Sequence, residues 1–195
     1  WSGTSGGEPG RSMEIFVLEG DLSLADIELG PGGYAFLPAG SLGFNLHTNG
    51  GARILYFVND VDQESIIRSP ILIDAGLLEW EASGTQGIKI KELRKDPVNA
   101  SRTWLLRIAP GVTQPWHSSS DVREGYLDEG DYWHSECVGG EVSTGQYLAG
   151  GYFYRPGDAV NGGPDSRAMS ESTWFLGEAR GGDITVQDCF QARSA

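Results

Sequence analysis

Residues 14–21 read EIFVLEGD, and residues 124–131 read EGYLDEGD. An offset of 110 positions aligns the two stretches and keeps their Glu-Gly-Asp endings in register. A second related pair follows in the same order: residues 31–40 read PGGYAFLPAG, and residues 148–158 read LAGGYFYRPGD. Because the two related segments follow each other in the same order in both halves, the chain is predicted to contain two tandem copies of one structural unit.

Short strands are the expected building blocks of this unit. Runs of alternating or β-branched residues, such as 15–18, 34–37, 53–58 and 103–108, are bounded by Gly, Pro, Asn and Asp, and the chain holds 29 glycines. A clean helical period with caps is absent, although residues 65–80 are compatible with a short helix. We therefore expect an all-β sandwich or barrel.

The net charge limits the partners of the chain. Its 14 basic and 27 acidic residues give a formal charge of −13, which repels phosphate backbones and anionic lipids. We expect no nucleic-acid partner and no membrane partner. Apolar stretches such as 66–78 are interrupted by charges and proline, and they are shorter than the roughly 20 residues that cross a bilayer.

No signal peptide is evident, so the cytoplasm is the default expectation. Cys137 and Cys189 could pair, but two cysteines do not make a disulfide scaffold.

The repeat predicts the domain boundaries. We assign residues 1–88 to a first unit, 89–102 to a linker or crossover, and 103–195 to a second unit. The linker gathers basic residues around Pro97, and a solvated crossover strand and loop is favoured over a site for an anionic partner. In the first unit the position that matches Trp104 falls before residue 1. Its opening strand is therefore expected to be missing or supplied elsewhere.

These segments resemble the cupins, and within them the two-repeat proteins similar to the C-terminal domain of anti-sigma factors that respond to singlet oxygen. The resemblance covers residues 14–57 and 103–182 and rests on the wording EIFVLEGD and PGGYAFLPAG. It implies two tandem double-stranded β-helices, or jelly-roll barrels. Cupins commonly dimerise through sheet edges, so the resemblance is consistent with a homodimer.

The usual cupin metal motif is G-x5-H-x-H-x3,4-E-x6-G, followed by a second motif with a third histidine. His117 fits the first ligand position of the second copy. The other positions hold Ser119, Arg123 and Asn161, and Glu124 lies one residue out of register. The first copy keeps no ligand, and a barrel lined by Met13, Ile15 and Val17 would be apolar and structural or dimer-forming, not catalytic.

Strand alternation leaves two alternatives for the second barrel. If Arg123 faces the interior, Glu124 faces out, and Arg123 beside His117 favours an organic anion over a cation. If a bulge turns Glu124 inward, the ligands His117, Glu124, Asn161 and His134 would form a weak site for one divalent metal, namely Fe, Zn, Mn or Ni. If no such metal site is formed, we expect a structural role for His134.

The expected function is binding of a small anionic or carbonyl-bearing molecule in the second barrel. Trp116, Ser119, Tyr152, Tyr154 and Asn161 are the candidate binding residues, because aromatic walls with a few polar groups are typical of small-molecule pockets. In a metal-independent isomerase or cyclase, His117 would be the general acid or base and Arg123 would stabilise charge. The alternatives are a metal-dependent dioxygenase acting on a diketone or phenolic compound, and a non-enzymatic sensor or interaction module.

Overall fold

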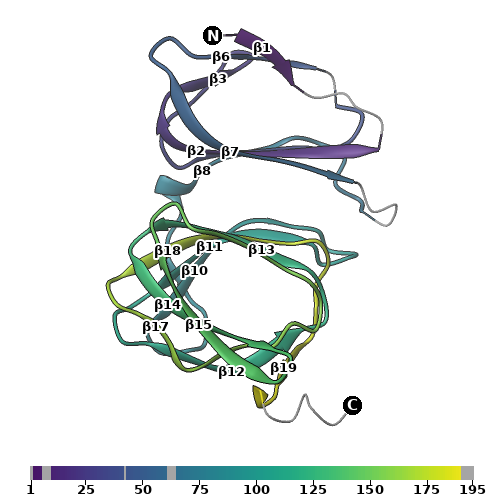
Figure 1. Ribbon diagram of the computed structural model, residues 1–195. Helices are drawn as coiled ribbons and strands as arrows, with labels where there is room; N and C mark the ends of the chain where they lie inside the picture. Colours follow the sequence, from purple (N-terminus) through teal and green to yellow (C-terminus); the bar gives the residue numbers. More distant parts are fainter. Residues whose placement is uncertain (1, 6–9, 42, 61–64, 190–195) are drawn as a thin grey trace. The chain divides into compact units, whose positions relative to one another are not determined.

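The computed structural model describes residues 2–5, 10–41, 43–60 and 65–189 (Figure 1). The chain divides into two compact units, 1–79 with 96–99, and 80–95 with 100–195. The fold is all-β, as predicted, and helical structure among the described residues is limited to the 3-10 turn η1 (Ala75–Leu77) and a 3-10 position at Cys189. No helix in the described part of the chain is long and apolar enough to span a membrane.

The first unit is built from two four-stranded antiparallel sheets with the orders β1-β6-β3-β4 and β7-β2-β5-β8. Its strands are β1 (Ser2–Ser5), β2 (Arg11–Gly20), β3 (Leu22–Leu24), β4 (Ile27–Leu29), β5 (Gly33–Leu37), β6 (Phe44–His47), β7 (Ala52–Asp60) and β8 (Ile71–Asp74). Met13, Ile15 and Val17 lie in one buried cluster with Leu22, Leu24, Leu29, Ala35, Leu37 and Leu46. The predicted apolar lining of the first barrel is therefore confirmed.

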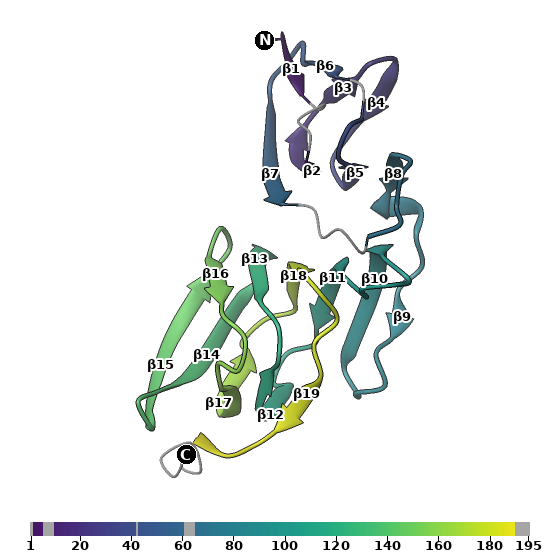
Figure 2. The same ribbon diagram turned by 90° about the vertical axis from the view of Figure 1, so that its right-hand side faces the viewer.

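The second unit is built from a six-stranded sheet, β16-β13-β18-β11-β10-β9, and a five-stranded sheet, β15-β14-β17-β12-β19, which face each other in Figure 1. Its strands are β9 (Glu81–Ala82), β10 (Ile88–Lys95), β11 (Arg102–Ile108), β12 (Thr113–Ser119), β13 (Arg123–Glu129), β14 (Asp131–Val138), β15 (Glu141–Leu148), β16 (Tyr152–Arg155), β17 (Asn161–Ala168), β18 (Ser172–Glu178) and β19 (Ile184–Val186). Figure 2 shows the hairpin of β14 and β15 and the path of β19 beside β12.

The apolar core of the second unit differs in composition from that of the first. It contains two tryptophans and a tyrosine, in a cluster made of Ile88, Trp104, Ile108, Leu127, Tyr132, Ala168, Trp174 and Leu176. These three rings are the largest side chains of the cluster, so they contribute a large part of the apolar surface that it buries.

Strands β2 and β13 occupy equivalent places in the two units. Strand β2 pairs with β5 and β7, and β13 pairs with β16 and β18. Both strands carry a bulge at the same repeat position, between Val17 and Glu19 and between Leu127 and Glu129. The sequence repeat thus corresponds to a repeat of strand pairing and of local backbone distortion.

The boundary between the units differs from the expected linker at 89–102. Strand β10 pairs with β11 over most of its length and belongs to the second unit. Residues 96–99 instead group with the first unit, because the Asp96 carboxylate accepts hydrogen bonds from Ser65 Oγ at 2.7 Å and the Ile66 amide at 3.0 Å. The basic residues of 89–95 therefore lie on a paired strand, where Lys89 and Lys95 are exposed and Lys91 and Arg94 are buried.

Strand β18 of the second unit is flanked by β11 and β13, whereas β7 has β2 alone as a neighbour in the described part of the first unit. The place that β11 fills in the second unit has no counterpart in the first unit's described sheets. A strand supplied from elsewhere stays a prediction.

Candidate functional site

The register of β13 determines which side chains face the inside of the second barrel. Arg123 pairs with Arg155 of β16 and with Glu178 of β18. Gly125 follows on the same face, and a Cβ added there would lie 2.4 Å from the Phe153 ring and 2.6 Å from Leu176, so this face is the packed interior. Arg123 therefore points inward, as the first alternative required.

Glu124 lies on the opposite face. Its Oε2 accepts a hydrogen bond from the Tyr152 hydroxyl at 2.6 Å, and Tyr152 and Tyr154 are 50% and 62% exposed. The bulge in β13 comes after Glu124, between Leu127 and Glu129, and so does not turn Glu124 inward. Glu124 was expected as a possible metal ligand, and Tyr152 and Tyr154 were expected to line the barrel. The register places all three side chains on the outer face instead.

A three-residue ionic network holds Arg123. Glu178 is almost fully buried, and its Oε1 accepts hydrogen bonds from Nε of Arg123 at 2.8 Å and from Nη2 of the same guanidinium. Its Oε2 accepts a hydrogen bond from Nε of Arg102 at 2.7 Å. Arg123 is thus already paired with a carboxylate that it shares with Arg102 and that the cupin motif did not indicate.

A second network surrounds Arg155, which is 8% exposed. Nη2 donates to Nε2 of His134 at 2.8 Å and to Oε1 of Glu136 at 3.1 Å, and Nε donates to the same Oε1 at 3.2 Å. The guanidinium lies 3.8 Å above the Phe153 ring centre, and the His134 ring is parallel to that ring at 6.5 Å. As expected from strand alternation, His134 and Glu136 share one face of β14.

Arg155 was not among the candidates derived from the sequence. It ends the run YFYR at 152–155, where alternation places Phe153 and Arg155 on the face opposite Tyr152 and Tyr154. That alternation is the signal that would have identified Arg155. Its partners could not be identified in the same way, because they depend on the pairing of distant strands.

Both histidines of the second barrel are neutral near pH 7. Burial, with the charge of Arg155, lowers the pKa of His134 from 6.5 to about 3. Burial lowers the pKa of His117 as well, and the positive charges of Arg123 and Arg155 act in the same direction, against the hydrogen bond to Pro115. These effects place His117 within electrostatic reach of both arginines.

His117 lies on β12 and pairs with Asn161 of β17. Its Nδ1 is 2.8 Å from the carbonyl oxygen of Pro115. The Asn161 amide donates to the carbonyl oxygens of Ala159 at 3.2 Å and His117 at 3.4 Å. Asn161 therefore holds backbone in place, and its amide nitrogen is engaged by that task.

Ser119 is also buried, two residues further along β12. Its Oγ accepts a hydrogen bond from the Asp121 amide at 3.4 Å and faces Gly182, where an added Cβ would lie 2.4 Å away. Ser119 thus holds the turn after β12, in contact with backbone and not with His117.

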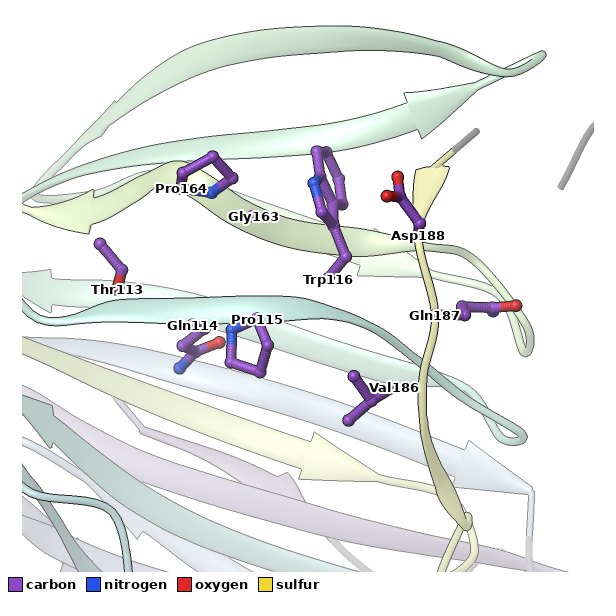
Figure 3. Close-up of a pocket in the computed structure, with 9 residues that line it drawn as sticks. All are labelled: Thr113, Gln114, Pro115, Trp116, Gly163, Pro164, Val186, Gln187 and Asp188. Carbon is purple, nitrogen blue, oxygen red and sulfur yellow. The ribbon is translucent and has the colours of Figure 1, made fainter. Parts of the chain in front are cut away.

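Trp116 lies on the other face of β12, in a surface groove of about 630 Å³ (Figure 3). A Cβ added at Gly163 would lie 2.3 Å from the indole, so the ring rests directly on this glycine. The groove is lined by Thr113, Gln114, Pro115, Trp116, Gly163, Pro164, Val186, Gln187 and Asp188. Trp116 therefore does not join His117 inside the barrel.

The donor set of the barrel does not fit the metal site that the cupin fold implies. Among the described residues, no three His, Cys, Asp or Glu side chains are placed to share a metal ion. Nε2 of His134 accepts a hydrogen bond from Arg155, and Glu136 is paired with the same guanidinium. A cation bound to these atoms would have to replace the hydrogen bonds that they make with Arg155. It would also be repelled by the nearby guanidinium charge.

Cys137 and Cys189 form a disulfide. It joins β14 to the segment after β19, and β19 pairs with His117, Ser118 and Ser119 of β12. Cys137 follows Glu136 directly, so the bridge is anchored next to the carboxylate that pairs with Arg155.

No protein-family model matches the sequence, and no curated protein matches it. Solved structures do. A proposed dioxygenase from Nostoc punctiforme has a TM-score of 0.72 at 20% identity, over 96% of this chain and 72% of its own. A proposed glyoxylate-induced protein from Pseudomonas aeruginosa has a TM-score of 0.72 at 15% identity, over 92% and 71%.

A variant of oxalate decarboxylase from Bacillus subtilis has a TM-score of 0.63 at 12% identity, over 92% of this chain and 68% of its own. At these identities the similarity concerns the fold alone, and the closer resemblance to anti-sigma-factor cupins is not addressed by it. With the repeated pairing of β2 and β13, these structures establish that the chain has the cupin jelly-roll fold.

Proposed function

We propose that the polar end of the second barrel binds a small organic anion, with Arg155 as the principal anchor. The observation that carries this proposal is a buried guanidinium whose donors are only partly used. Nε and Nη2 donate to Glu136 and His134, whereas Nη1 has no hydrogen-bond partner among the described residues. A planar guanidinium with free N–H groups is well suited to hold a carboxylate.

The surroundings of Arg155 support an anion over a cation. The protein as a whole carries a charge of −13. In contrast, two positive side chains, Arg123 and Arg155, both act on His117 inside the second barrel. Phe153, Tyr147 and Trp174 pack against one another beside His134 and supply aromatic walls. An ion pair formed in such surroundings is less weakened by solvent than one at the surface.

Thermal stabilisation tests this proposal. We expect carboxylates such as acetate, propanoate and benzoate to raise the melting temperature relative to chloride at equal ionic strength, because a ligand that binds the folded state stabilises it. Arg155→Met should abolish the effect. Arg53→Met is the matched control, since Arg53 is exposed in the first unit and pairs with Glu19. Equal stabilisation of the wild type and Arg155→Met, or none in either, would refute the proposal.

A second candidate is metal-independent isomerisation or cyclisation with His117 as the acid–base group. It is favoured by the hydrogen bond from Nδ1 to the Pro115 carbonyl, which leaves Nε2 without a proton and free to accept one. Exchange of a carbon-bound ligand proton for deuterium in D2O, lost in His117→Gln, would support it. Binding without exchange or turnover would instead favour the sensor alternative.

Metal-dependent dioxygenation is not favoured, because Glu124 lies outside the barrel and His134 is bonded to Arg155. We expect mass spectrometry to find metal well below one atom per chain after expression with iron, manganese, nickel and zinc. One metal per chain would contradict this expectation. A homodimer is proposed as well, and light scattering of the purified protein tests it.

A further inference from the structure

The hydrogen bonds of His117 determine which of its ring nitrogens carries the proton. Nδ1 lies 2.8 Å from the carbonyl oxygen of Pro115, and a carbonyl oxygen can only accept. Nδ1 must therefore be the protonated nitrogen. Because the ring is neutral, Nε2 carries a lone pair, and no described residue donates a hydrogen bond to it. His117 thus presents an acceptor.

The proton of His134 is fixed by the same logic. Its Nε2 lies 2.8 Å from Nη2 of Arg155, and a guanidinium can only donate. Nε2 of His134 is therefore already occupied as an acceptor, and the proton lies on Nδ1. The free acceptor of this pair of histidines is Nε2 of His117.

Strand pairing gives the spacing between the backbone that carries this acceptor and the backbone that carries the carboxylate bound to Arg155. Asn161 of β17 pairs with His117 on one side and with Glu136 on the other. The backbones at His117 and Glu136 are thus two strand spacings apart, roughly 10 Å. Arg155 is bound to Glu136 and its charge acts on His117, so the guanidinium and the imidazole belong to the same part of the barrel, and a molecule that contacts both is small.

We infer that the ligand is a small hydroxy-carboxylic acid, with its carboxylate on Nη1 of Arg155 and its hydroxyl donating to Nε2 of His117. This rests on the proposed anion-binding function and narrows its chemistry. A 2-oxo acid would place a carbonyl oxygen against the lone pair of Nε2, and a plain carboxylic acid would leave that acceptor unpaired. Either mismatch weakens binding.

Calorimetry at pH 7.5 with the three-carbon acids lactate, pyruvate and propanoate tests the inference, because they differ at C2 alone. The six-membered-ring analogues mandelate, phenylglyoxylate and phenylacetate repeat the comparison with a group that the aromatic walls can contact. We expect the hydroxy acid of each set to bind at least about tenfold more tightly than the other two. This comparison needs no variant and is therefore independent of any folding defect.

His117→Gln should remove the preference while binding persists, because its amide offers both a donor and an acceptor. His47→Gln is the matched control, since His47 is exposed in the first unit and bonded to Asn49. If the oxo acid or the plain acid binds as tightly as the hydroxy acid, and binding still requires Arg155, the inference is wrong and the anion site stands. If no acid binds at all, both the inference and the proposed function fail.

Discussion

Nη2 of Arg155 lies 2.8 Å from Nε2 of His134, and the two groups determine each other's state. Burial, together with the permanent charge of the guanidinium, lowers the pKa of the imidazole and keeps it neutral, and the neutral imidazole accepts a hydrogen bond from the guanidinium. Glu136 takes two further hydrogen bonds, so Arg155 is held from two positions on β14. A side chain held in this way is oriented before any ligand arrives, which reduces the entropy lost on binding.

The buried histidines predict that acid destabilises the protein. The pKa of His134 is 6.5 in the unfolded chain and about 3 when folded, so between these values the unfolded state binds more protons. The free energy of unfolding should therefore fall as the pH drops below 6.5, by about 2 kcal/mol between pH 7 and pH 5 from His134 alone. Urea unfolding at both pH values measures this. In His134→Phe the pH dependence should shrink by that amount; an unchanged dependence would contradict the assignment.

Glu178 predicts a large loss of stability on neutralisation. It is buried between Arg102 and Arg123, and Glu178→Gln would leave both guanidiniums facing an amide. We expect a loss of about 3 kcal/mol in urea unfolding, as is usual when a buried pair loses one partner. The matched control is Glu19→Gln: Glu19 also lies 2.7 Å from an arginine nitrogen, but its side chain is 68% exposed. The control should cost less than about 1 kcal/mol, and equal losses would refute the argument.

Much of the fold could be predicted because it depends on local pattern. The repeat at 14–21 and 124–131 predicted the equivalent strands β2 and β13, and alternation correctly related an inward Arg123 to an outward Glu124. The same alternation, applied to 152–155, would have excluded Tyr152 and Tyr154 from the interior. The aromatic composition of this run is typical of a ligand pocket, but its period places both tyrosines on the outer face.

The partners inside the barrel could not be predicted in this way. Arg123 and Glu178 are 55 residues apart, and Arg155 and His134 are 21 apart. Each contact requires the register between two strands and the length of the connection that joins them. The cupin motif supplied expected positions for metal ligands, and where those positions hold Arg123 and Asn161 it gave no indication of the partners of these side chains.

Gly130 predicts that a single methyl group is not tolerated at the end of β13. Its φ is +100°, and an added Cβ would lie 2.5 Å from the Glu171 carbonyl oxygen and 2.6 Å from Ser172 Oγ. Gly130→Ala should cost more than about 3 kcal/mol, since the strained φ and the clash with backbone act together. Gly84 has a φ of +89° with nothing within 4 Å, so Gly84→Ala isolates the φ cost of about 1 kcal/mol. Similar values for both variants would show that the strand end adapts.

The disulfide predicts that its reduction lowers the stability of the fold and loosens β19, the strand that pairs with β12. The three residues of β19 are exposed and, among the described strands, pair with β12 alone. Asp183 and Gln187 on either side are hydrogen-bonded to the β12 segment, and Cys137–Cys189 adds a covalent restraint to β14. The bridge spans 52 positions, and closing a loop of that length stabilises a fold by roughly 2–4 kcal/mol. Replacing both cysteines by serine should lower the free energy of unfolding by that amount.

The same double variant should increase amide hydrogen exchange at Ile184, Thr185 and Val186 and leave the amides of β13 protected, because β13 is paired on both sides. Reduction of the wild type should reproduce the exchange pattern and thus serves as the control for the substitutions. Since β19 pairs with His117, loosening it should also weaken binding of any ligand that requires this histidine. Unchanged exchange at 184–186 would mean that the pairing with β12 holds β19 without the bridge.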